Sequence, residues 1–572
     1  MNKKWFAFGC LSVVVIVVIF FVGSFRMMKN FTKTNTKKIT EGSWLVLDLK
    51  GPVNEHSLYS DSFLGLSSVG LSDIMEKLAQ ARTDSKIEGI ILKPRSAMMG
   101  MAEVNQFHNL IKEFKMTGKP VIAYIDNATS VDYFLCSAAD EIWLNPSQSA
   151  GIMLNGIGAT AVFYKDLLTK LGVKVNVIHA GKYKSAGDSY SRNSMSNAMK
   201  ESYTVVLKER FAKLKKFLEL SRGMTPEQVE HLYQKRDNFV VKGEYAYKYG
   251  VVDTLGYEGD MFDKFGIDED KLVKISKYGR PSFPFPGDKI AIVYAEGPIT
   301  PVTTGRGSTI SAKQINKVLD KLQKDTNVKA VVLRVNSPGG SALESDIIAN
   351  KIKMLQKVKP IVVSMGDVAA SGGYYISAPC DYIYSDPFTI TGSIGVIMMM
   401  PDASGLASEI GIKTESISLS KFHGFGNLWK KPSSTMLKAL NDEVQDIYTE
   451  FKTVVSEGRD MPMDEVEKYA QGRIWGAELA DAHGLIDQVG SMGDAVVKAA
   501  ELVDLTDYTI DIYPKKKSIF EFILNNKGSF LTLLKSNSAG VRGELMQKAA
   551  DLEQMLENEK AFMMLPVEIE MD

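Results

Sequence analysis

Short apolar runs rich in β-branched residues alternate with amphipathic stretches along most of the chain. Runs such as "KAVVLRV" (329–335), "PIVVSM" (360–365) and "DYIYS" (381–385) have the length and composition of buried strands. The segment "AKQINKVLDKLQKD" (312–325) spaces its apolar residues three and four positions apart, as a helix with one buried face does. Strands that alternate with helices predict βα units and a mainly parallel sheet, so the expected fold class is α/β.

This pattern occurs twice. The first copy opens with "SWLVLDLKGPV" and the second with "DKIAIVYAEGPI", and later "DSKIEGIILKPRS" matches "DTNVKAVVLRVNS". The register continues, with Asp126 facing Asp367 and Ser130 facing Ser371. The proline- and glycine-rich segment "RPSFPFPGD" (280–288) has the composition of a linker between the copies. We therefore expect a tandem repeat of two α/β domains.

An uncharged apolar run from Trp5 to Phe25 precedes the repeats and is long enough, as a helix, to cross about 30 Å of hydrocarbon. The sequence "FFVGSFR" is a poor cleavage site, which favours an uncleaved signal anchor over a cleavable signal peptide. Lysines precede the span, and an arginine and further lysines follow it, so charge alone leaves its orientation open. The predicted organisation is a short N-terminal tail (1–4), a transmembrane anchor (5–25), a linker (26–42), two repeats (43–285 and 286–513) and a C-terminal tail (514–572).

The repeat pattern stops after about Tyr513. The tail that follows contains a helical stretch with one apolar face, formed by Leu545, Ala549, Leu552 and Leu556. Such a face is typical of a helix that lies on a membrane surface or docks against a neighbouring subunit, and docking is the simpler interpretation.

Composition narrows the range of functions. Hydrophobic residues make up 45% of the chain and charged residues 24%, as in ordinary globular proteins. The 68 basic and 68 acidic residues cancel, which gives no indication of a nucleic-acid partner. Outside the predicted anchor, Cys136 and Cys380 lie in apolar helical patterns and are expected to be buried thiols. No histidine pair or CxxC spacing suggests zinc, so we expect neither metal nor cofactor.

The two copies differ at positions that bear on chemistry. In the second copy a predicted strand runs into "SPGG" (337–340), where the first copy has "SAMM". A proline followed by glycines lets the backbone turn sharply and present amide hydrogens to a developing oxyanion. Ser371 is followed by Gly372 and Gly373, whereas its counterpart Ser130 is followed by larger residues. The missing side chains would let a substrate carbonyl approach the Ser371 hydroxyl and the next amide together.

A serine at the start of a helix ordinarily caps that helix, so a catalytic role for Ser371 needs a partner base. Two candidates occupy roughly equivalent positions in the two copies: His423 in "SKFHGFGN" and Lys184 in "GKYKSAGDSY". No carboxylate is visibly placed to orient His423, and a lone histidine is more often a surface or core residue. Taken by itself, Lys184 would be an ordinary solvated lysine.

The motifs "VNSPGGS", "GDVAASGGYYIS", "TGSIGV" and "GKYKSA", on a tandem repeat behind an N-terminal span, closely resemble the signal peptide peptidase SppA (protease IV) family in its long, two-repeat form. The resemblance implies a crotonase/ClpP-like fold for each repeat. It also implies that Ser371 is the nucleophile, that Lys184 of the other repeat is the general base and that Ser393 orients this lysine. The amides of Gly340 and Gly372 would form the oxyanion hole.

By the same resemblance, the chain would be a Ser/Lys-dyad serine endopeptidase that degrades cleaved signal peptides and similar apolar peptides. It would be a single-pass protein of the bacterial inner (cytoplasmic) membrane, with its catalytic body on the periplasmic side, and a homo-oligomer, tetrameric in the long form. The mechanism requires burial to lower the pKa of Lys184 from about 10.4 to about 7 or 8. The alternatives are a catalytically inactive anchored scaffold, against which the retained reactive residues argue, and a crotonase-type acyl-CoA enzyme, which a serine paired with a lysine fits poorly.

Overall fold

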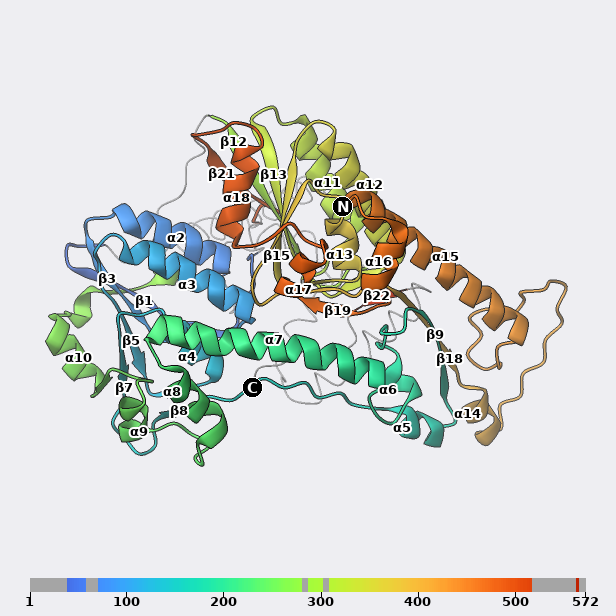
Figure 1. Ribbon diagram of the computed structural model, residues 1–572, viewed down its shortest axis with the longest axis horizontal. Coiled ribbons are helices and arrows are strands. Elements are labelled where there is room, and N and C mark those ends of the chain that lie inside the picture. The colour runs from blue at the N-terminus through green and yellow to red at the C-terminus, as the bar shows by residue number, and fades with distance from the viewer. Residues whose placement is uncertain (1–38, 58–69, 280–286, 302–307, 517–561, 565–572) are drawn as a thin grey trace, which may run out of the picture.

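The computed structural model describes residues 39–57, 70–279, 287–301, 308–516 and 562–564. Two largely parallel sheets, one from each half of the chain, form its body (Figure 1). The predicted anchor at 5–25 and most of the C-terminal tail lie outside the described residues. Within the described part of the chain, no helix is both long enough and apolar enough to cross a membrane.

The first sheet has six parallel strands in the order β10-β7-β5-β3-β1-β11. Its strands are β1 (Ser43–Leu47), β3 (Ile87–Leu92), β5 (Val121–Ile125), β7 (Glu141–Leu144), β10 (Thr254–Leu255) and β11 (Leu272–Lys274). Side chains from four helices pack on one face of the sheet: α2 (Leu71–Thr83), α3 (Met101–Lys115), α4 (Ser130–Cys136) and α7 (Asn197–Arg222). Helix α10 (Glu258–Phe265) packs on the opposite face, so the sheet is buried on both sides.

The second sheet repeats this plan, with parallel strands in the order β21-β12-β13-β15-β16-β20. These strands are β12 (Lys289–Glu296), β13 (Val328–Ser337), β15 (Ile361–Ala370), β16 (Tyr382–Ser385), β20 (Gln488–Val489) and β21 (Thr509–Tyr513). One face is covered by α11 (Ala312–Lys324), α12 (Ala342–Gln356), α13 (Gly372–Ser377) and α15 (Ser434–Gly458), the other by α18 (Met492–Glu501). The far end of β15 also pairs with β17 (Ile390–Gly392), which in turn pairs antiparallel with β19 (Ile474–Gly476).

The elements predicted from hydrophobic spacing are present, and the α/β class is confirmed. Helix α11 begins after Ser311, whose Oγ accepts a hydrogen bond from Gln314 N at 3.4 Å, and it buries Ile315, Leu319 and Leu322. Each of these side chains contributes about 1.5–3 kcal/mol by burial. Strand β13 is buried almost throughout, which explains why its sequence is nearly continuous in apolar residues.

A third sheet joins the two repeats, with four strands in the order β14-β22-β18-β9. Strand β9 (Lys174–Ala180) of the first repeat pairs antiparallel with β18 (Val396–Asp402) of the second along its whole length (Figure 1). Strand β22 (Phe562–Met564), near the C-terminus, lies between β18 and β14 (Gly339–Ser341). Segments that are remote in the sequence are thus held together beside the "SPGG" loop.

A buried ion pair also crosses between the repeats. Arg334 on β13 donates to both carboxylate oxygens of Glu55 at 2.8 and 2.7 Å, and to Gln106 at 3.1 Å. Nearby, Asp367 on β15 accepts a hydrogen bond from Ala102 N at the start of α3, at 2.9 Å. Removing one member of such a buried pair costs about 3–5 kcal/mol, so these contacts fix how the repeats sit together.

The cysteines of the body are buried thiols, as predicted. Cys136 and Cys380 are both free, and burial raises the pKa of each thiol well above its ordinary value. Among the described residues, no group of three or more His, Cys, Asp or Glu side chains is placed to hold a metal ion.

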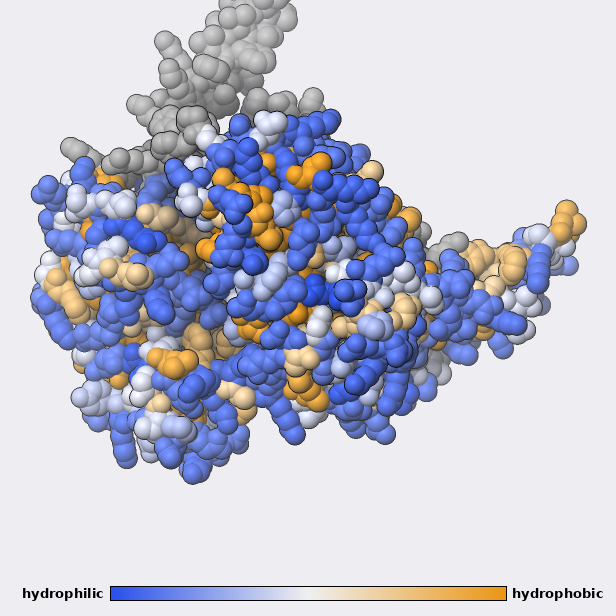
Figure 2. All heavy atoms as spheres, turned by 45° about the horizontal axis from the view of Figure 1, so that its top comes forward, coloured by the Kyte–Doolittle hydropathy of each residue, from blue (hydrophilic) through white to orange (hydrophobic). Residues whose placement is uncertain are grey.

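Residues 404–433, called the arm below, comprise helix α14 (Ser404–Glu409) and the segment that leads into α15. Figures 1 and 2 show this part of the chain projecting from the body, with hydrophobic residues along it and at its tip. Large apolar side chains of the arm are solvent-exposed: Ile410, Ile412, Ile417, Leu419, Phe422, Phe425, Leu428 and Trp429.

Candidate active site

Ser371 lies where strand β15 ends and the short helix α13 begins. Its φ of 55° and ψ of −116° are unusual for a residue with a side chain, so the surrounding structure must hold this turn. The Ser371 N–H donates to the Gly392 carbonyl at 2.8 Å, and its carbonyl accepts from Tyr375 N at 2.8 Å. Although α13 is described in full, the Ser371 side chain makes no capping hydrogen bond to it. Ser371 therefore does not act as an ordinary helix cap.

The two glycines that begin α13 allow close packing of backbone against backbone. A Cβ on Gly372 would lie 2.6 Å from Ser345 Oγ and 3.2 Å from Gly340 N, and one on Gly373 would lie 2.7 Å from the Ser337 carbonyl oxygen. We expected these glycines to clear space for a substrate. The structure shows that they also serve the packing of α13, because they bring the turn at the end of β15 against the "SPGG" loop, and the role in admitting a substrate stays a prediction.

Lys184 reaches Ser371 from the other repeat of the same chain. It follows strand β9, and its Nζ lies 2.6 Å from Ser371 Oγ. The segment that carries it is held to the second repeat by a hydrogen bond from Tyr183 N to the Gln471 carbonyl at 2.7 Å. The sequence left open whether the two side chains meet within one chain or between chains, and the structure joins them within one chain.

The surroundings of the Lys184 amine are dry. The Lys184 side chain is 1% exposed, and Ser371 and Ser393 are fully buried. This burial lowers the pKa of Lys184 well below its ordinary value, because a charged amine loses its hydration there. Each unit of lowering corresponds to about 1.4 kcal/mol of disfavoured charge. An amine whose pKa is lowered in this way is neutral, and therefore able to accept a proton, at a lower pH than an ordinary lysine.

Ser393 holds the amine from the side opposite the nucleophile candidate. Lys184 Nζ donates to the Ser393 carbonyl oxygen at 2.9 Å and contacts Ser393 Oγ at 3.0 Å. Ser393 follows β17 with a φ of 53°, and its N–H donates to the Arg473 carbonyl at 2.7 Å. Two hydrogens of a neutral amine are satisfied in this way, which leaves its lone pair for the hydroxyl of Ser371.

The two glycines expected to supply the oxyanion hole pack against each other, because a Cβ on Gly372 would lie 3.2 Å from Gly340 N. On one side of β14, Ile299 N donates to the Gly339 carbonyl at 2.9 Å and Ser341 N donates to the Ile299 carbonyl at 2.8 Å. The N–H and carbonyl of Gly340 therefore point away from Ile299, because these groups alternate along an extended strand. A Cβ on Gly340, whose φ is 154°, would clash with the Ile299 carbonyl oxygen, so this position requires glycine.

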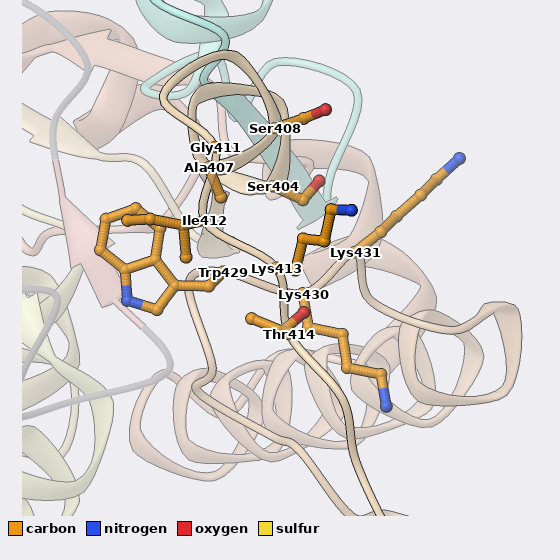
Figure 3. Close-up of a pocket in the computed structure, with 10 residues that line it drawn as sticks. All are labelled: Ser404, Ala407, Ser408, Gly411, Ile412, Lys413, Thr414, Trp429, Lys430 and Lys431. Carbon is orange, nitrogen blue, oxygen red and sulfur yellow. The ribbon is translucent and has the colours of Figure 1, made fainter.

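His423, the other candidate base, does not join this group of residues. It lies exposed on the arm. The pocket in Figure 3 also belongs to the arm, where the Trp429 ring lies on one side and the side chains of Lys413, Lys430 and Lys431 extend on the other. None of the five predicted site residues lines this pocket.

Sequence reasoning missed the contact that positions the lysine. Gly472, with a φ of 72°, packs directly on the Lys184 backbone, and a Cβ there would lie 2.6 Å from both Lys184 N and Lys184 Cβ. Gly181 packs in turn against Gln471. A glycine between a helix and a strand ordinarily indicates a turn, so no signal in the sequence distinguished Gly472 from other turn glycines.

The chain matches peptidase family S49 over two segments, residues 113–271 and 353–506, one in each half of the chain. Among solved structures, a ClpP1 variant from Listeria monocytogenes aligns with 36% of this chain and 94% of its own length, at 16% identity and a TM-score of 0.24. That likeness is too weak to bear on the fold of either repeat, so the crotonase/ClpP-like assignment stays a prediction.

Three relatives align with most of the chain. The Protease 4 of Salmonella typhi is 32% identical over 534 residues, which cover 86% of this chain and 83% of the relative. The Protease 4 of Haemophilus influenzae is 31% identical over 90% of this chain and 87% of its own length. The chloroplastic serine protease SPPA of Arabidopsis thaliana is 31% identical over 85% and 72%, respectively. The chain thus belongs to peptidase family S49 and is a serine peptidase of the two-repeat SppA type.

Proposed function

We propose that this protein is a membrane-anchored endopeptidase in which Ser371 is the nucleophile and Lys184 the general base. The observation that carries the proposal is the 2.6 Å contact between Lys184 Nζ and Ser371 Oγ in a fully buried setting. Ser393 orients the amine, and the amides of Gly340 and Gly372 stabilise the oxyanion.

The proposed reaction follows from this arrangement. The neutral Lys184 amine takes the hydroxyl proton as Ser371 attacks a peptide carbonyl, and the negative oxygen is bound by the two glycine amides. The ammonium of Lys184 then returns its proton to the leaving amine. Water hydrolyses the acyl-enzyme, with Lys184 again acting as base, and Ser371 is regenerated.

The proposed substrates are cleaved signal peptides and similar apolar peptides. The predicted anchor at 5–25 supports this choice, since it would place the catalytic body beside the bilayer in which such peptides remain. We further propose that the protein resides in the bacterial inner membrane, with the body on the periplasmic side. Protease accessibility of the body in spheroplasts tests this orientation, and a body that resists external protease in intact spheroplasts but not in lysed cells would contradict it.

A homo-oligomer, tetrameric by resemblance, is also proposed, and the arm supports it. Ile417 is 87% exposed and Leu419 is 99% exposed, and a run of exposed apolar residues is typical of a protein contact surface. Changing both residues to serine should lower the mass of the solubilised protein in light scattering. An unchanged mass would place the subunit contact elsewhere or contradict the oligomer.

Two variants and one label test the catalytic assignment. Ser371→Ala and Lys184→Ala should each abolish hydrolysis of a fluorescence-quenched apolar peptide while preserving the fold, as seen by circular dichroism. A serine-directed acylating probe followed by peptide mapping should modify Ser371. Full activity in either variant would refute the dyad, and absence of labelling would favour the alternatives of an inactive scaffold or an acyl-CoA enzyme.

A further inference from the structure

Arg473 connects the two segments that hold the Lys184 amine. It lies between Gly472, which packs on the Lys184 backbone, and strand β19. The main-chain carbonyl of Arg473 accepts a hydrogen bond from Ser393 N at 2.7 Å, and Ser393 in turn contacts the amine. The Arg473 side chain extends to the other segment, which carries Lys184 itself. One residue of the second repeat is therefore joined to both sides of the proposed general base.

The Arg473 guanidinium lies over two aromatic rings. Its Cζ is 4.8 Å from the centroid of the Tyr183 ring and 4.7 Å from that of the Trp475 ring. A guanidinium in such a position is attracted to the face of each ring. Trp475 belongs to β19 and is only 6% exposed, so it gives the guanidinium a fixed support. Tyr183 directly precedes Lys184, so the contact acts on the backbone that carries the base.

A hydrogen bond and an ion pair complete the contact of Arg473 with the first repeat. Arg473 Nη1 donates to the Tyr183 hydroxyl at 3.4 Å, and Arg473 Nη2 lies 3.2 Å from Glu201 Oε1 on helix α7. The Tyr183 hydroxyl donates to the same Glu201 oxygen at 3.1 Å. A planar guanidinium can make these contacts and stack on the rings at once, whereas a lysine ammonium is a compact point charge. The arrangement therefore favours arginine at this position.

We propose that Arg473 is a positioning residue that fixes the Lys184 amine against Ser371. The inference rests on the proposed function, because it takes Lys184 as the base and Ser371 as the nucleophile. Arg473 contributes no atom to the reaction. Its side chain holds Tyr183 while its carbonyl holds Ser393, so the amine and the serine that orients it keep one geometry. Loss of the guanidinium would release Tyr183 and let water approach the amine, which would change both the rate and the pKa of the base.

Steady-state kinetics of Arg473→Ala on the fluorescence-quenched apolar peptide test this role. We expect kcat to fall about 10- to 100-fold at unchanged KM, because a displacement of about 1 Å at a catalytic group can lower a rate about 100-fold. The acid limb of the kcat profile should move to higher pH, since a base that gains contact with water regains part of its ordinary pKa.

Arg459→Ala is the matched control for the loss of an arginine. Arg459 Nη2 lies 2.6 Å from Asp487 Oδ1, and this ion pair is confined to the second repeat. The control should lose stability but keep both kcat and the acid limb. Equal kinetic losses in Arg473→Ala and Arg459→Ala would overturn the proposal, because they would show that loss of an ion pair, rather than contact with Tyr183, is responsible.

Variants of Tyr183 test the same contact from the other side, and they remain available if circular dichroism shows that Arg473→Ala is unfolded. Tyr183→Leu removes the ring and should lower kcat about as much as Arg473→Ala. Tyr183→Phe keeps the ring over the guanidinium, so its kcat should lie between those of Tyr183→Leu and the wild type. The double variant Tyr183→Leu/Arg473→Ala should be no slower than either single variant, because both changes break one contact. Losses that multiply in the double variant would contradict a shared role.

The kinetic outcomes separate this inference from the function on which it rests. Unchanged kcat and acid limb in folded Arg473→Ala, or in Tyr183→Leu, would overturn the positioning role, and an inactive Ser371→Ala would leave the proposed function standing. Full activity in Ser371→Ala would remove both the positioning role and the proposed function.

Discussion

The buried amine of Lys184 has two opposite effects on this protein. Removal from water makes it a base that can accept a proton from Ser371, but the same burial penalises its charged form and so lowers the stability of the fold. The burial that favours catalysis at Lys184 is therefore the same burial that lowers the stability of the fold. The three oxygen contacts, one to Ser371 and two to Ser393, orient the amine but bring no opposite charge to it.

Replacing Lys184 with methionine should separate these two effects. Because the folded-state pKa of Lys184 lies below its unfolded value, the wild-type protein binds fewer protons when folded, and its stability rises with pH through the interval between the two values. Lys184→Met should abolish peptide hydrolysis yet stabilise the fold at pH 7 by on the order of 1–3 kcal/mol. Denaturant unfolding at pH 7 and pH 10 should show this gain shrinking at the higher pH. A variant less stable than wild type at pH 7 would contradict a buried amine with a lowered pKa.

Ser393 is expected to act as a positioning residue. Ser393→Ala removes one of the two contacts that hold the amine and leaves the carbonyl contact in place, at a cost of about 0.5–1.5 kcal/mol. We expect kcat to fall roughly twofold to tenfold at unchanged KM. The acid limb of the pH profile should move to lower pH, because a hydrogen-bond acceptor of the ammonium is lost. A change confined to KM, or an unmoved acid limb, would argue against this role.

The pairing of β9 with β18 places Lys184 of the first repeat beside Ser371 of the second. The final step of this placement is the contact between Gly472 and the Lys184 backbone, at the point where the segment leaves β9. A displacement of about 1 Å at a catalytic group can lower a rate about 100-fold. Peptide hydrolysis at Ser371 should therefore depend on residues such as Gly472, which contribute no reacting atom.

Gly472→Ala tests this dependence. The added Cβ would press on the Lys184 backbone, so kcat should fall about 100-fold while the protein remains folded. Gly484→Ala is the matched control, because Gly484 has a similar positive φ of 67° but its Cβ would meet only the flexible end of Met461, at 3.3 Å. The control should lose stability by a comparable amount and keep its kcat. Equal losses of kcat in the two variants would show that backbone strain, rather than the Lys184 contact, is responsible.

The sequence could predict elements and some residues, but not the contacts between remote segments. Helix α11 and strand β13 follow from the local spacing of apolar residues. The comparison of the two copies pointed to Ser371, because only the second copy has glycines directly after this serine. The pairings of β9 with β18 and of β22 with β14 join segments far apart in the chain, and local periodicity carries no information about them. Lys184 could be assigned only by resemblance, because the pattern around it is that of a solvated lysine.

A buried polar cluster lies between the two repeats and helps to hold them together. Besides the Glu55–Arg334 pair, Asp386 on the second repeat accepts a hydrogen bond from Asn105 of α3 at 2.9 Å. Burial raises the pKa of Asp386 to about 7 and that of Glu296 to about 7. The contact between the repeats is therefore sensitive to pH in the physiological range.

Stability should fall as these carboxyl groups ionise. Because the folded-state pKa of Asp386 is raised, the stability it contributes is fully present below its ordinary pKa and is lost as the pH rises through about 7. Asp386→Asn keeps a neutral side chain at every pH and should gain on the order of 1–3 kcal/mol relative to wild type between pH 5 and pH 8. Denaturant unfolding at both pH values measures this difference. An identical pH dependence in variant and wild type would contradict the raised pKa.

The pH dependence of Ser371 acylation shows whether a neutral Lys184 activates this serine. The rate of modification by a serine-directed fluorophosphonate should rise with pH and level off at an apparent pKa well below the 10.5 of an ordinary lysine, with Ser371 as the labelled residue and no labelling in Lys184→Met. A rate that still climbs unchanged beyond pH 10, or a label on another residue, would rule out a neutral Lys184 as the base that activates Ser371.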